Sequence, residues 1–451
     1  MCDWSEFVHE YCLRALDTST DPASGHLSVN TLGIVIEIVV FSTCFHFIAT
    51  LGEAFMSPAF ESLSLRLGGI SEVVASVLIA VTLSLPETSI SFLSALKGEF
   101  STNHSLAIST IIGSGWISLL LIPGIVSLRM KAELPGIAVF RDIVFFGIMM
   151  MLLQRTIEDD TVTVGESLLF MFFYGLYFLS LSLTQLIERK QRTQRRQSRV
   201  LVQLAPLQNL IEETELLERL PIDMALSHEE FTSGMEPMSL PRPPVSEHFL
   251  LPDSSGDDFM LYPVKYKETA TSRILSFVCV KASPGTDTER LYMVSIINIF
   301  AIQLLLSSII TAVSNRWVLL VSADQATGST NLVGSVVVGF FSKLTDILHA
   351  LSATTPFAAN HVVTSSLASQ IFSIGIGLGL TWCLNGAIRG STHIDNSAVK
   401  LNVRIGLVAV GIFALFSVFN FRDSKICYAQ PKLMLCSYFL LVLGFIILSL
   451  E

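Results

Sequence analysis

The feature that most constrains this chain is a series of long apolar stretches separated by short polar ones. A helix needs roughly 20 mostly apolar residues to cross the hydrocarbon core of a bilayer. The sequence therefore predicts an all-α polytopic membrane protein with about ten transmembrane helices. The predicted spans are residues 31–54, 70–96, 105–128, 136–154, 162–187, 290–313, 330–353, 360–388, 400–420 and 431–450.

Composition supports this prediction and excludes several classes of protein. Only 15% of the 451 residues are charged, against about 25% in a typical soluble chain. A net charge of −10 argues against a nucleic-acid partner. The odd number of cysteines and the lack of a CxxC motif exclude a secreted disulfide scaffold. Because the sequence contains no phosphate-binding loop, dinucleotide fingerprint, HExxH or nucleophile elbow, we expect neither an enzyme nor a permanently bound cofactor.

The apolar stretches form two groups around a polar segment, residues 188–289. This segment opens with a basic run at 188–199, which should stay cytoplasmic and lie against anionic lipid. Its low apolar content predicts a mostly disordered linker, with one short strand at 271–281. Five crossings before a cytoplasmic linker make residues 1–30 an extracytoplasmic N-terminal segment. The chain is thus an integral membrane protein of the plasma membrane or an endomembrane, and nothing in the sequence indicates its oligomeric state.

The odd number of spans in each group predicts their relative orientation. Residues 31–187 and residues 290–451 each contain five candidate spans. Because five is odd, the second group enters the membrane in the opposite orientation to the first. Inverted repeats of this kind are a common plan of secondary transporters, whose binding site lies near the midplane between the repeats. We therefore expect two inverted five-helix repeats with polar residues at matching positions.

In the first repeat, the second span contains such polar residues. Pro86 frees backbone carbonyls, and Ser84 and Glu87 lie three residues apart on one helix face. Carboxylate, hydroxyl and carbonyl oxygens are the ligands that hard cations such as Ca²⁺ prefer. A glutamate inside a membrane span indicates a functional site, although a purely structural pairing is the alternative. In the next span, Ser114 stands among glycines, which fits either cation binding or close helix packing.

In the second repeat, the matching span contains Lys343, Asp346 and His349 at steps of three, so we expect them on one helix face. The lysine and the aspartate could form a structural ion pair instead of a binding site. His349 lies near the end of the span and is more simply explained as a solvated or capping residue. In the following span, Ser369 and Gln370 precede glycines whose spacing favours close packing.

These residues give the first repeat a resemblance to the cation/Ca²⁺ exchanger superfamily, strongest over residues 50–128. Stretches 53–58 and 67–75 resemble the start of the family's first alpha repeat. Residues 83–87, Leu-Ser-Leu-Pro-Glu, resemble its Gly-(Ser/Thr)-Ser-x-Pro-Glu signature, and residues 112–114, Ile-Gly-Ser, resemble the Gly-Ser-Asn element that follows. The ten-helix inverted architecture and the central cytoplasmic loop fit the family as well.

The resemblance implies an antiporter that exchanges Ca²⁺ for a monovalent cation by alternating access. The counter-ion is either Na⁺, alone or together with K⁺, or H⁺. The resemblance also implies that the principal metal-binding carboxylates are Glu87 and Asp346. The implied cation-binding hydroxyls are Ser84, Ser114, Ser342 and Ser369. The transported ions and the lipid bilayer are then the only expected partners.

The second repeat departs from the family pattern. Its signature reads Phe-Ser-Lys-Leu-Thr-Asp over residues 341–346, so the glycine and proline are missing and Lys343 replaces a ligating serine. If Lys343 points into the pocket, its ammonium acts as a tethered cation, and we hypothesise that fewer counter-ions bind in each cycle. The alternative is a degenerate, non-transporting homologue that acts as a membrane sensor or scaffold through its linker.

Overall fold

A computed structural model describes most of the two predicted repeats. The described residues are 31–56, 72–97, 101–130, 134–184, 270–276, 289–321, 330–353, 355–390, 392–394, 397–422, 425–426 and 431–450. Residues 1–30 and nearly all of the predicted linker 188–289 lie outside them, so the domain boundaries stay predictions. The chain divides into a helical unit, residues 1–181 with 266–451, and a second unit, residues 182–265, which lies beyond the described residues after 184.

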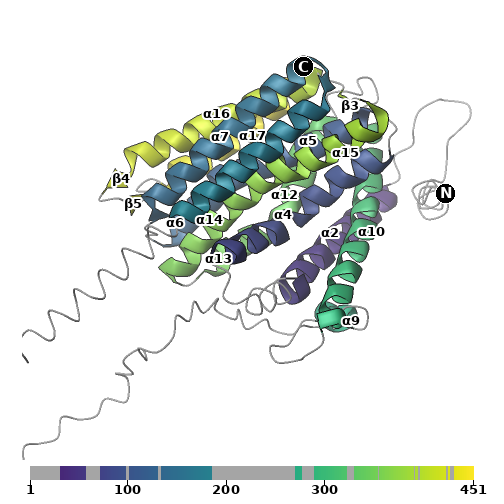
Figure 1. Ribbon diagram of the computed structural model, residues 1–451, viewed down its shortest axis with the longest axis horizontal. Helices are drawn as coiled ribbons and strands as arrows, with labels where there is room; N and C mark the ends of the chain where they lie inside the picture. Colours follow the sequence, from purple (N-terminus) through teal and green to yellow (C-terminus); the bar gives the residue numbers. More distant parts are fainter. Residues whose placement is uncertain are drawn as a thin grey trace, which may run out of the picture. The chain divides into compact units, whose positions relative to one another are not determined.

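The described residues are mostly helical, as the sequence predicts (Figure 1). The helices of the first half are α2 (Thr31–Leu51) continued by η3 (Gly52–Met56), α4 (Glu72–Lys97), α5 (Ser101–Trp116) continued by η4 (Ile117–Leu121) and α6 (Ile122–Arg129), α7 (Gly136–Glu158) and the span Val164–Thr184. Those of the second half are α10 (Glu289–Val321), η7 (Val333–Val338) with α12 (Gly339–Ser342) and α13 (Leu344–Ser352), α14 (Pro356–Phe372) continued by η8 (Ser373–Leu378) and α15 (Gly379–Arg389), α16 (Ser397–Phe419) and α17 (Pro431–Leu450).

Eight of the described helices are long and apolar enough to cross a membrane. The bent pair Thr330–Ser342 and Leu344–Ser352 makes nine if it counts as one span. The chain is therefore an integral multi-pass membrane protein, whereas the count of ten spans stays a prediction.

Two local expectations were wrong. Residues 271–281 were expected to form a strand, but Ala270–Leu275 form a short helix, α9, whose Leu275 is buried with apolar residues of α2 and α10. The span 330–353 was expected to be one continuous helix, but it breaks at Lys343 and bends by 42°. Lys343 caps the start of α13, and its ammonium lies 3.3 Å from Oδ2 of Asp346, so these two residues share a side as expected.

Two pairs of short strands show that the halves are inverted. Strand β1 (Leu134–Pro135), between the third and fourth helical segments of the first half, pairs with β5 (Lys425–Ile426) of the hairpin that joins α16 to α17. Strand β2 (Thr161–Val162), between the fourth and fifth segments, pairs with β3 (Thr392–His393), between α15 and α16. In both cases the connection between segments three and four of one half lies beside the connection between segments four and five of the other half. Since successive connections alternate between the two sides of a membrane, the halves run in opposite directions.

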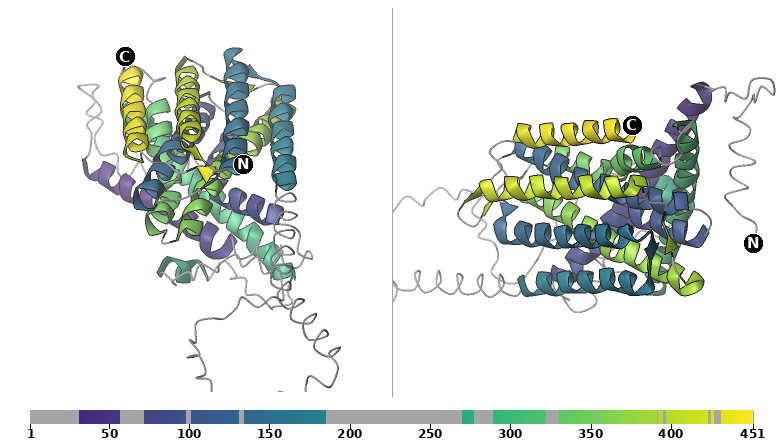
Figure 2. Two further views of the ribbon diagram at one scale, coloured as in Figure 1. Left: turned by 90° about the vertical axis from the view of Figure 1, so that its left-hand side faces the viewer. Right: turned by 90° about the horizontal axis from the view of Figure 1, so that it is seen from above.

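The helices of the two halves pack against each other in matching pairs. Helix α2 contacts α10, α7 contacts α16, α4 contacts α14 and α5 contacts η7. Four segments, α17, α16, α7 and Val164–Thr184, stand side by side (Figure 2). Helices α5 and η7 approach each other so closely that a Cβ atom at Gly113 would overlap the backbone of Ser335. Small residues that let two helix backbones approach closely are typical of membrane helices.

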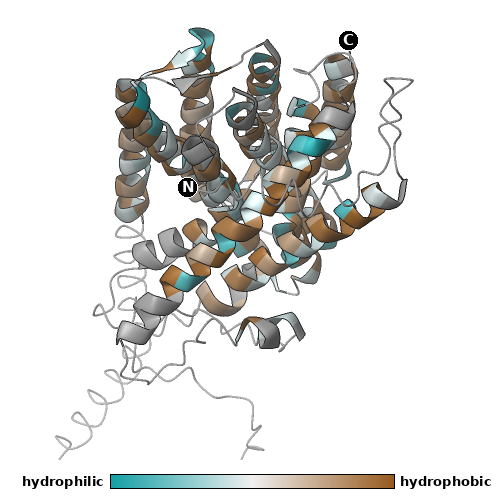
Figure 3. Ribbon diagram, turned by 90° about the vertical axis from the view of Figure 1, so that its right-hand side faces the viewer, coloured by the Kyte–Doolittle hydropathy of each residue, from teal (hydrophilic) through white to brown (hydrophobic). Residues whose placement is uncertain are grey.

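The outward faces of these helices are apolar. Hydrophobic residues run along the helices in Figure 3, with few hydrophilic ones. Large side chains such as Ile137, Phe172, Phe419 and Leu440 are exposed. Many exposed large apolar side chains are expected of a protein whose helices face lipid.

Candidate functional site

The ammonium of Lys343 lies in a cluster of buried polar side chains, which we call the pocket. Its other members are Glu87, Ser342, Asp346, Ser366 and Ser369. Lys343 joins α12 to α13, and its φ and ψ of −101° and 6° turn the chain between the two helices. Its side chain is fully buried. The ammonium nitrogen lies 3.4 Å from Oε1 of Glu87, 3.3 Å from Oδ2 of Asp346 and 2.9 Å from Oγ of Ser369. Lys343 therefore points into the pocket and contacts both predicted carboxylates.

Glu87 enters the pocket from α4, one residue after the proline inside that helix. Its side chain is fully buried, and the hydroxyl of Ser342 lies 3.3 Å from Oε1. The second carboxylate oxygen, Oε2, has no hydrogen-bond partner among the described residues. A buried carboxylate oxygen without a partner is costly, so this atom indicates a place for a cation or a water molecule.

Asp346 enters from the first turn of α13 and is also buried. Its Oδ2 atom lies 3.1 Å from the hydroxyl of Ser366 on α14, which in turn lies 2.8 Å from the hydroxyl of Ser118 on η4. The serine pair thus connects the second carboxylate to the first half of the chain.

The remaining predicted serines have different surroundings. Ser114 on α5 donates to the backbone oxygen of Ile111 and lies 3.1 Å from the side-chain oxygen of Gln370 on α14. Ser369 accepts a hydrogen bond from Lys343. Ser84 is buried on α4, and its hydroxyl donates to the backbone oxygen of Val81, 2.8 Å away in the same helix. Whether these hydroxyls bind a cation stays a prediction.

Two residues of the site were not singled out from the sequence. Ser366 precedes Ser369 by three residues and therefore lies on the same face of α14. Ser118 follows Ser114 by four residues, on the same side of its helix. The helical spacing from a predicted serine is the signal that could have found both. Their contact with each other depends on the packing of the two halves, which the spacing does not give.

The charge of the pocket follows from these contacts. Two carboxylates and one ammonium, all buried, leave one net negative charge when each group is ionised. No group of three or more His, Cys, Asp and Glu side chains that could hold a metal ion occurs in the described part of the chain. The pocket contains two carboxylates and several hydroxyls, and oxygen atoms of these kinds are suited to hard cations.

Other buried charges are paired away from this pocket. Glu37 of α2 lies 3.0 Å from Arg316 of α10 and accepts a hydrogen bond from Trp317, which ties together the first helices of the two halves. On α7, Arg141 donates two hydrogen bonds to Asp142. Neither pair contacts Glu87 or Asp346, and in both pairs the buried carboxylate is compensated by an arginine.

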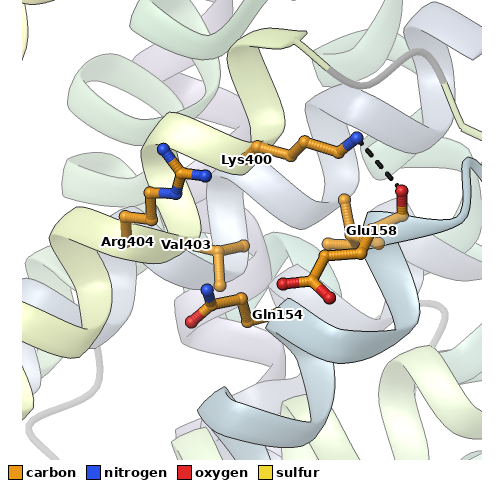
Figure 4. A pocket seen from close by; sticks show the side chains of 6 residues that line it. Gln154, Glu158, Lys400, Val403 and Arg404 are labelled. Carbon is orange, nitrogen blue, oxygen red and sulfur yellow. Dashed lines mark hydrogen bonds between the residues drawn. The ribbon is translucent and has the colours of Figure 1, made fainter.

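A second polar group lies between α7 and α16 (Figure 4). Its lining includes Glu158, Lys400 and Arg404. The ammonium of Lys400 donates to the backbone oxygen of Glu158 and lies 3.1 Å from Asp160. Because the side chains of Lys400 and Asp160 are 32% and 52% exposed, this is a solvated ion pair at the ends of the helices, and it is separate from the buried pocket.

Similar proteins were found for the first half of the chain. Residues 37–183 match the model of the family "Sodium/calcium exchanger protein". The sodium/potassium/calcium exchanger 2 of Mus musculus is 25% identical over 158 residues, 35% of this chain and 23% of that protein. The sodium/potassium/calcium exchanger 5 of Homo sapiens is 30% identical over 151 residues, 33% of this chain and 29% of that protein. The matches thus span about a quarter of the length of these relatives.

A solved structure is similar over nearly the whole chain. The crystal structure of the H⁺/Ca²⁺ exchanger CAX superposes with a TM-score of 0.52, covering 98% of this chain and 93% of that one at 12% identity. At this identity the likeness concerns the fold alone. Residues 37–183 of this chain are thus similar to sodium/calcium exchanger proteins, and its helical fold is similar to that of the crystallised exchanger.

Proposed function

We propose that this protein is a secondary active antiporter, which exchanges Ca²⁺ for a monovalent cation across a membrane by alternating access. Glu87 and Asp346 are the proposed ligands of the transported Ca²⁺, and the hydroxyls of Ser342, Ser366 and Ser369 complete the pocket. The proposal agrees with the names of the relatives, which are exchangers of calcium with sodium and potassium or with protons.

The observation that carries the proposal is the unpartnered oxygen of Glu87. This atom is buried between two inverted halves, beside a second carboxylate that belongs to the other half. A carboxylate inside a membrane protein is expensive to bury and faces a partner or a pathway. Ion pairing with Lys343 accounts for one oxygen of Glu87 and leaves the other for a transported ion.

The test is uptake of ⁴⁵Ca²⁺ into proteoliposomes under an imposed gradient of Na⁺, K⁺ or H⁺. We expect uptake under at least one gradient for the wild-type protein, and its loss in Glu87→Gln, which keeps the size of the side chain but removes the charge. Glu158→Gln is the matched control, because Glu158 lies outside the pocket and is 44% exposed. Equal uptake by wild type and Glu87→Gln would overturn the assignment of the site.

One contact favours a second candidate function, a non-transporting homologue that acts as a membrane sensor or scaffold. The ammonium of Lys343 contacts both carboxylates and Ser369, so it compensates charge that a transported cation would otherwise balance. If folded wild-type protein takes up no Ca²⁺ under any gradient, this second candidate replaces the first.

The proposed orientation places the N-terminus on the extracytoplasmic side and residues 188–289 in the cytoplasm, with a basic run that contacts anionic lipid. Accessibility of a tag at each of these places in intact and permeabilised cells tests it. A linker tag that is accessible in intact cells would reverse the orientation.

A further inference from the structure

We propose that the ammonium of Lys343 takes the place of one transported monovalent cation, so that this protein exchanges Ca²⁺ for one counter-ion fewer than its pocket would require with a neutral residue at that position. The inference rests on the proposed function and concerns the coupling ratio of the same site. The chemical class of the displaced ion is a monovalent cation, whichever of Na⁺, K⁺ or H⁺ drives transport.

The contacts of Lys343 are those expected of a bound cation. An ammonium has three donors, and here three oxygen atoms surround it: those of Glu87, Asp346 and Ser369. These oxygens come from three different helices, α4, α13 and α14, and from both halves of the chain. The side chain is fully buried, so water does not compete for these contacts. The tethered ammonium thus lies where a free cation would have to bridge the same carboxylates.

The backbone keeps the ammonium at this place. Lys343 lies at the break between α12 and α13, and its backbone N–H and C=O remain bonded to Phe340 and Ile347 in the adjoining helices. Its side chain begins only three residues from Asp346 in the same chain segment. Since the lysine is part of the second half of the site, its charge stays with that half through each cycle, whereas a transported ion leaves.

The charge of the pocket gives the size of the effect. With Lys343 the pocket carries one net negative charge, and with a neutral residue it carries two when both carboxylates are ionised. One additional monovalent cation restores the original balance. Because buried charge without compensation is strongly unfavourable, we expect the variant to take up this extra cation, whereas the wild type does not.

The experiment measures the coupling ratio in proteoliposomes with the membrane potential held at zero. The Ca²⁺ ratio at which net ⁴⁵Ca²⁺ flux vanishes equals the counter-ion ratio raised to the number of counter-ions exchanged. Wild type is compared with Lys343→Ser and Lys343→Met, which both remove the charge, although only serine adds an oxygen ligand. Lys400→Met is the matched control for loss of a lysine outside the pocket.

For a tenfold counter-ion gradient, we expect the Ca²⁺ ratio at zero flux to rise about tenfold in both Lys343 variants and to stay unchanged in Lys400→Met. An unchanged ratio in variants that transport overturns this inference and leaves the proposed function intact. A rise in Lys343→Ser alone also overturns it, because the added oxygen would then be the cause. If neither variant folds, a wild-type exponent of two or more overturns it, because a pocket with one net negative charge then binds more than one counter-ion. Absence of flux in folded wild-type protein overturns the proposed function and this inference together.

Discussion

The second helical segments of the two halves solve the same structural problem differently. In the first half, α4 continues through Pro86 and places Glu87 in the pocket, while Ser84 bonds to its own backbone. In the second half, the matching segment breaks at Lys343, which points inward beside Asp346. The two halves share a fold and oppose each other in orientation. Among the described residues, the positive charge beside the two carboxylates comes from the second half. The inverted arrangement of the two halves can thus be retained while the charge of the site between them changes.

The third segments show a complementary change. Gly115 follows Ser114 in the first half, and Gln370 follows Ser369 in the second. A Cβ atom at Gly115 would lie 3.6 Å from the side-chain oxygen of Gln370. That is ordinary van der Waals contact, and the tighter neighbour of such an atom is the ring of Phe146 at 3.2 Å. Gln370 reaches Ser114 across the interface between the halves.

The largest expected effect on stability comes from removing the charge that distinguishes the second half. Lys343→Met leaves Glu87 and Asp346 close together without compensation, and breaking a buried ion pair in this way costs about 3–5 kcal/mol. Thermal unfolding in detergent without Ca²⁺ should show this loss, and added Ca²⁺ should recover part of it by binding the folded state. Lys400→Met, which removes an exposed pair, should cost about 1 kcal/mol or less. Equal unfolding temperatures for the two variants would contradict the pocket contacts.

The next largest effect should distinguish two interfaces between the halves. At one of them α5 packs against η7, and at the other η8 packs against α4. In Gly113→Ala the new methyl group overlaps the carbonyl of Ser335, which is backbone and cannot rotate away. In Gly377→Ala it lies 2.8 Å from the Cγ2 methyl group of Thr88, a side chain that can adjust. Overpacking costs about 1–3 kcal/mol, so we expect Gly113→Ala at or above this range and Gly377→Ala near its lower end.

Yield of monodisperse protein and the unfolding temperature measure both variants. A Gly377→Ala protein less stable than Gly113→Ala would reverse the order and indicate that α5 and η7 are not in the described contact.

The smallest effect concerns a hydroxyl that only the second half has at its position. Ser366 precedes Ser369 by three residues, whereas Ile111 precedes Ser114 by three. Ser366→Ala removes the contact with Asp346, whose Oδ2 atom keeps the Lys343 ammonium at 3.3 Å. The cost is therefore that of one hydrogen bond, about 0.5–1.5 kcal/mol. We expect a higher Ca²⁺ concentration at half-maximal uptake.

Ser365→Ala is the neighbouring control for this variant, since the Ser365 hydroxyl donates to its own helix at Val362. If Ser365→Ala raises the half-maximal Ca²⁺ concentration as much as Ser366→Ala does, the contact with Asp346 is not the reason.

Much of the site was predictable because membrane helices constrain polar residues strongly. Glu87 and Asp346 stand out in apolar spans, and the inverted arrangement follows from an odd number of spans in each half. The strand predicted at 271–281 was wrong where the structure describes it, because burial of Leu275 against α2 and α10 stabilises a helical turn there. The straight helix predicted through Lys343 was wrong as well, since spacing in sequence does not reveal where a helix breaks.

The sequence by itself determined the helical membrane fold class, and it predicted the inversion of the halves and the two carboxylates of the site, because bilayer thickness and the cost of buried charge act on local patterns. Only the tertiary structure decided that Lys343 lies between those carboxylates and that Ser118 and Ser366 connect Asp346 to the first half. It also left one oxygen of Glu87 without a hydrogen-bond partner among the described residues. These contacts join residues as many as 256 positions apart. Such contacts depend on how the two halves pack, and no local pattern specifies this.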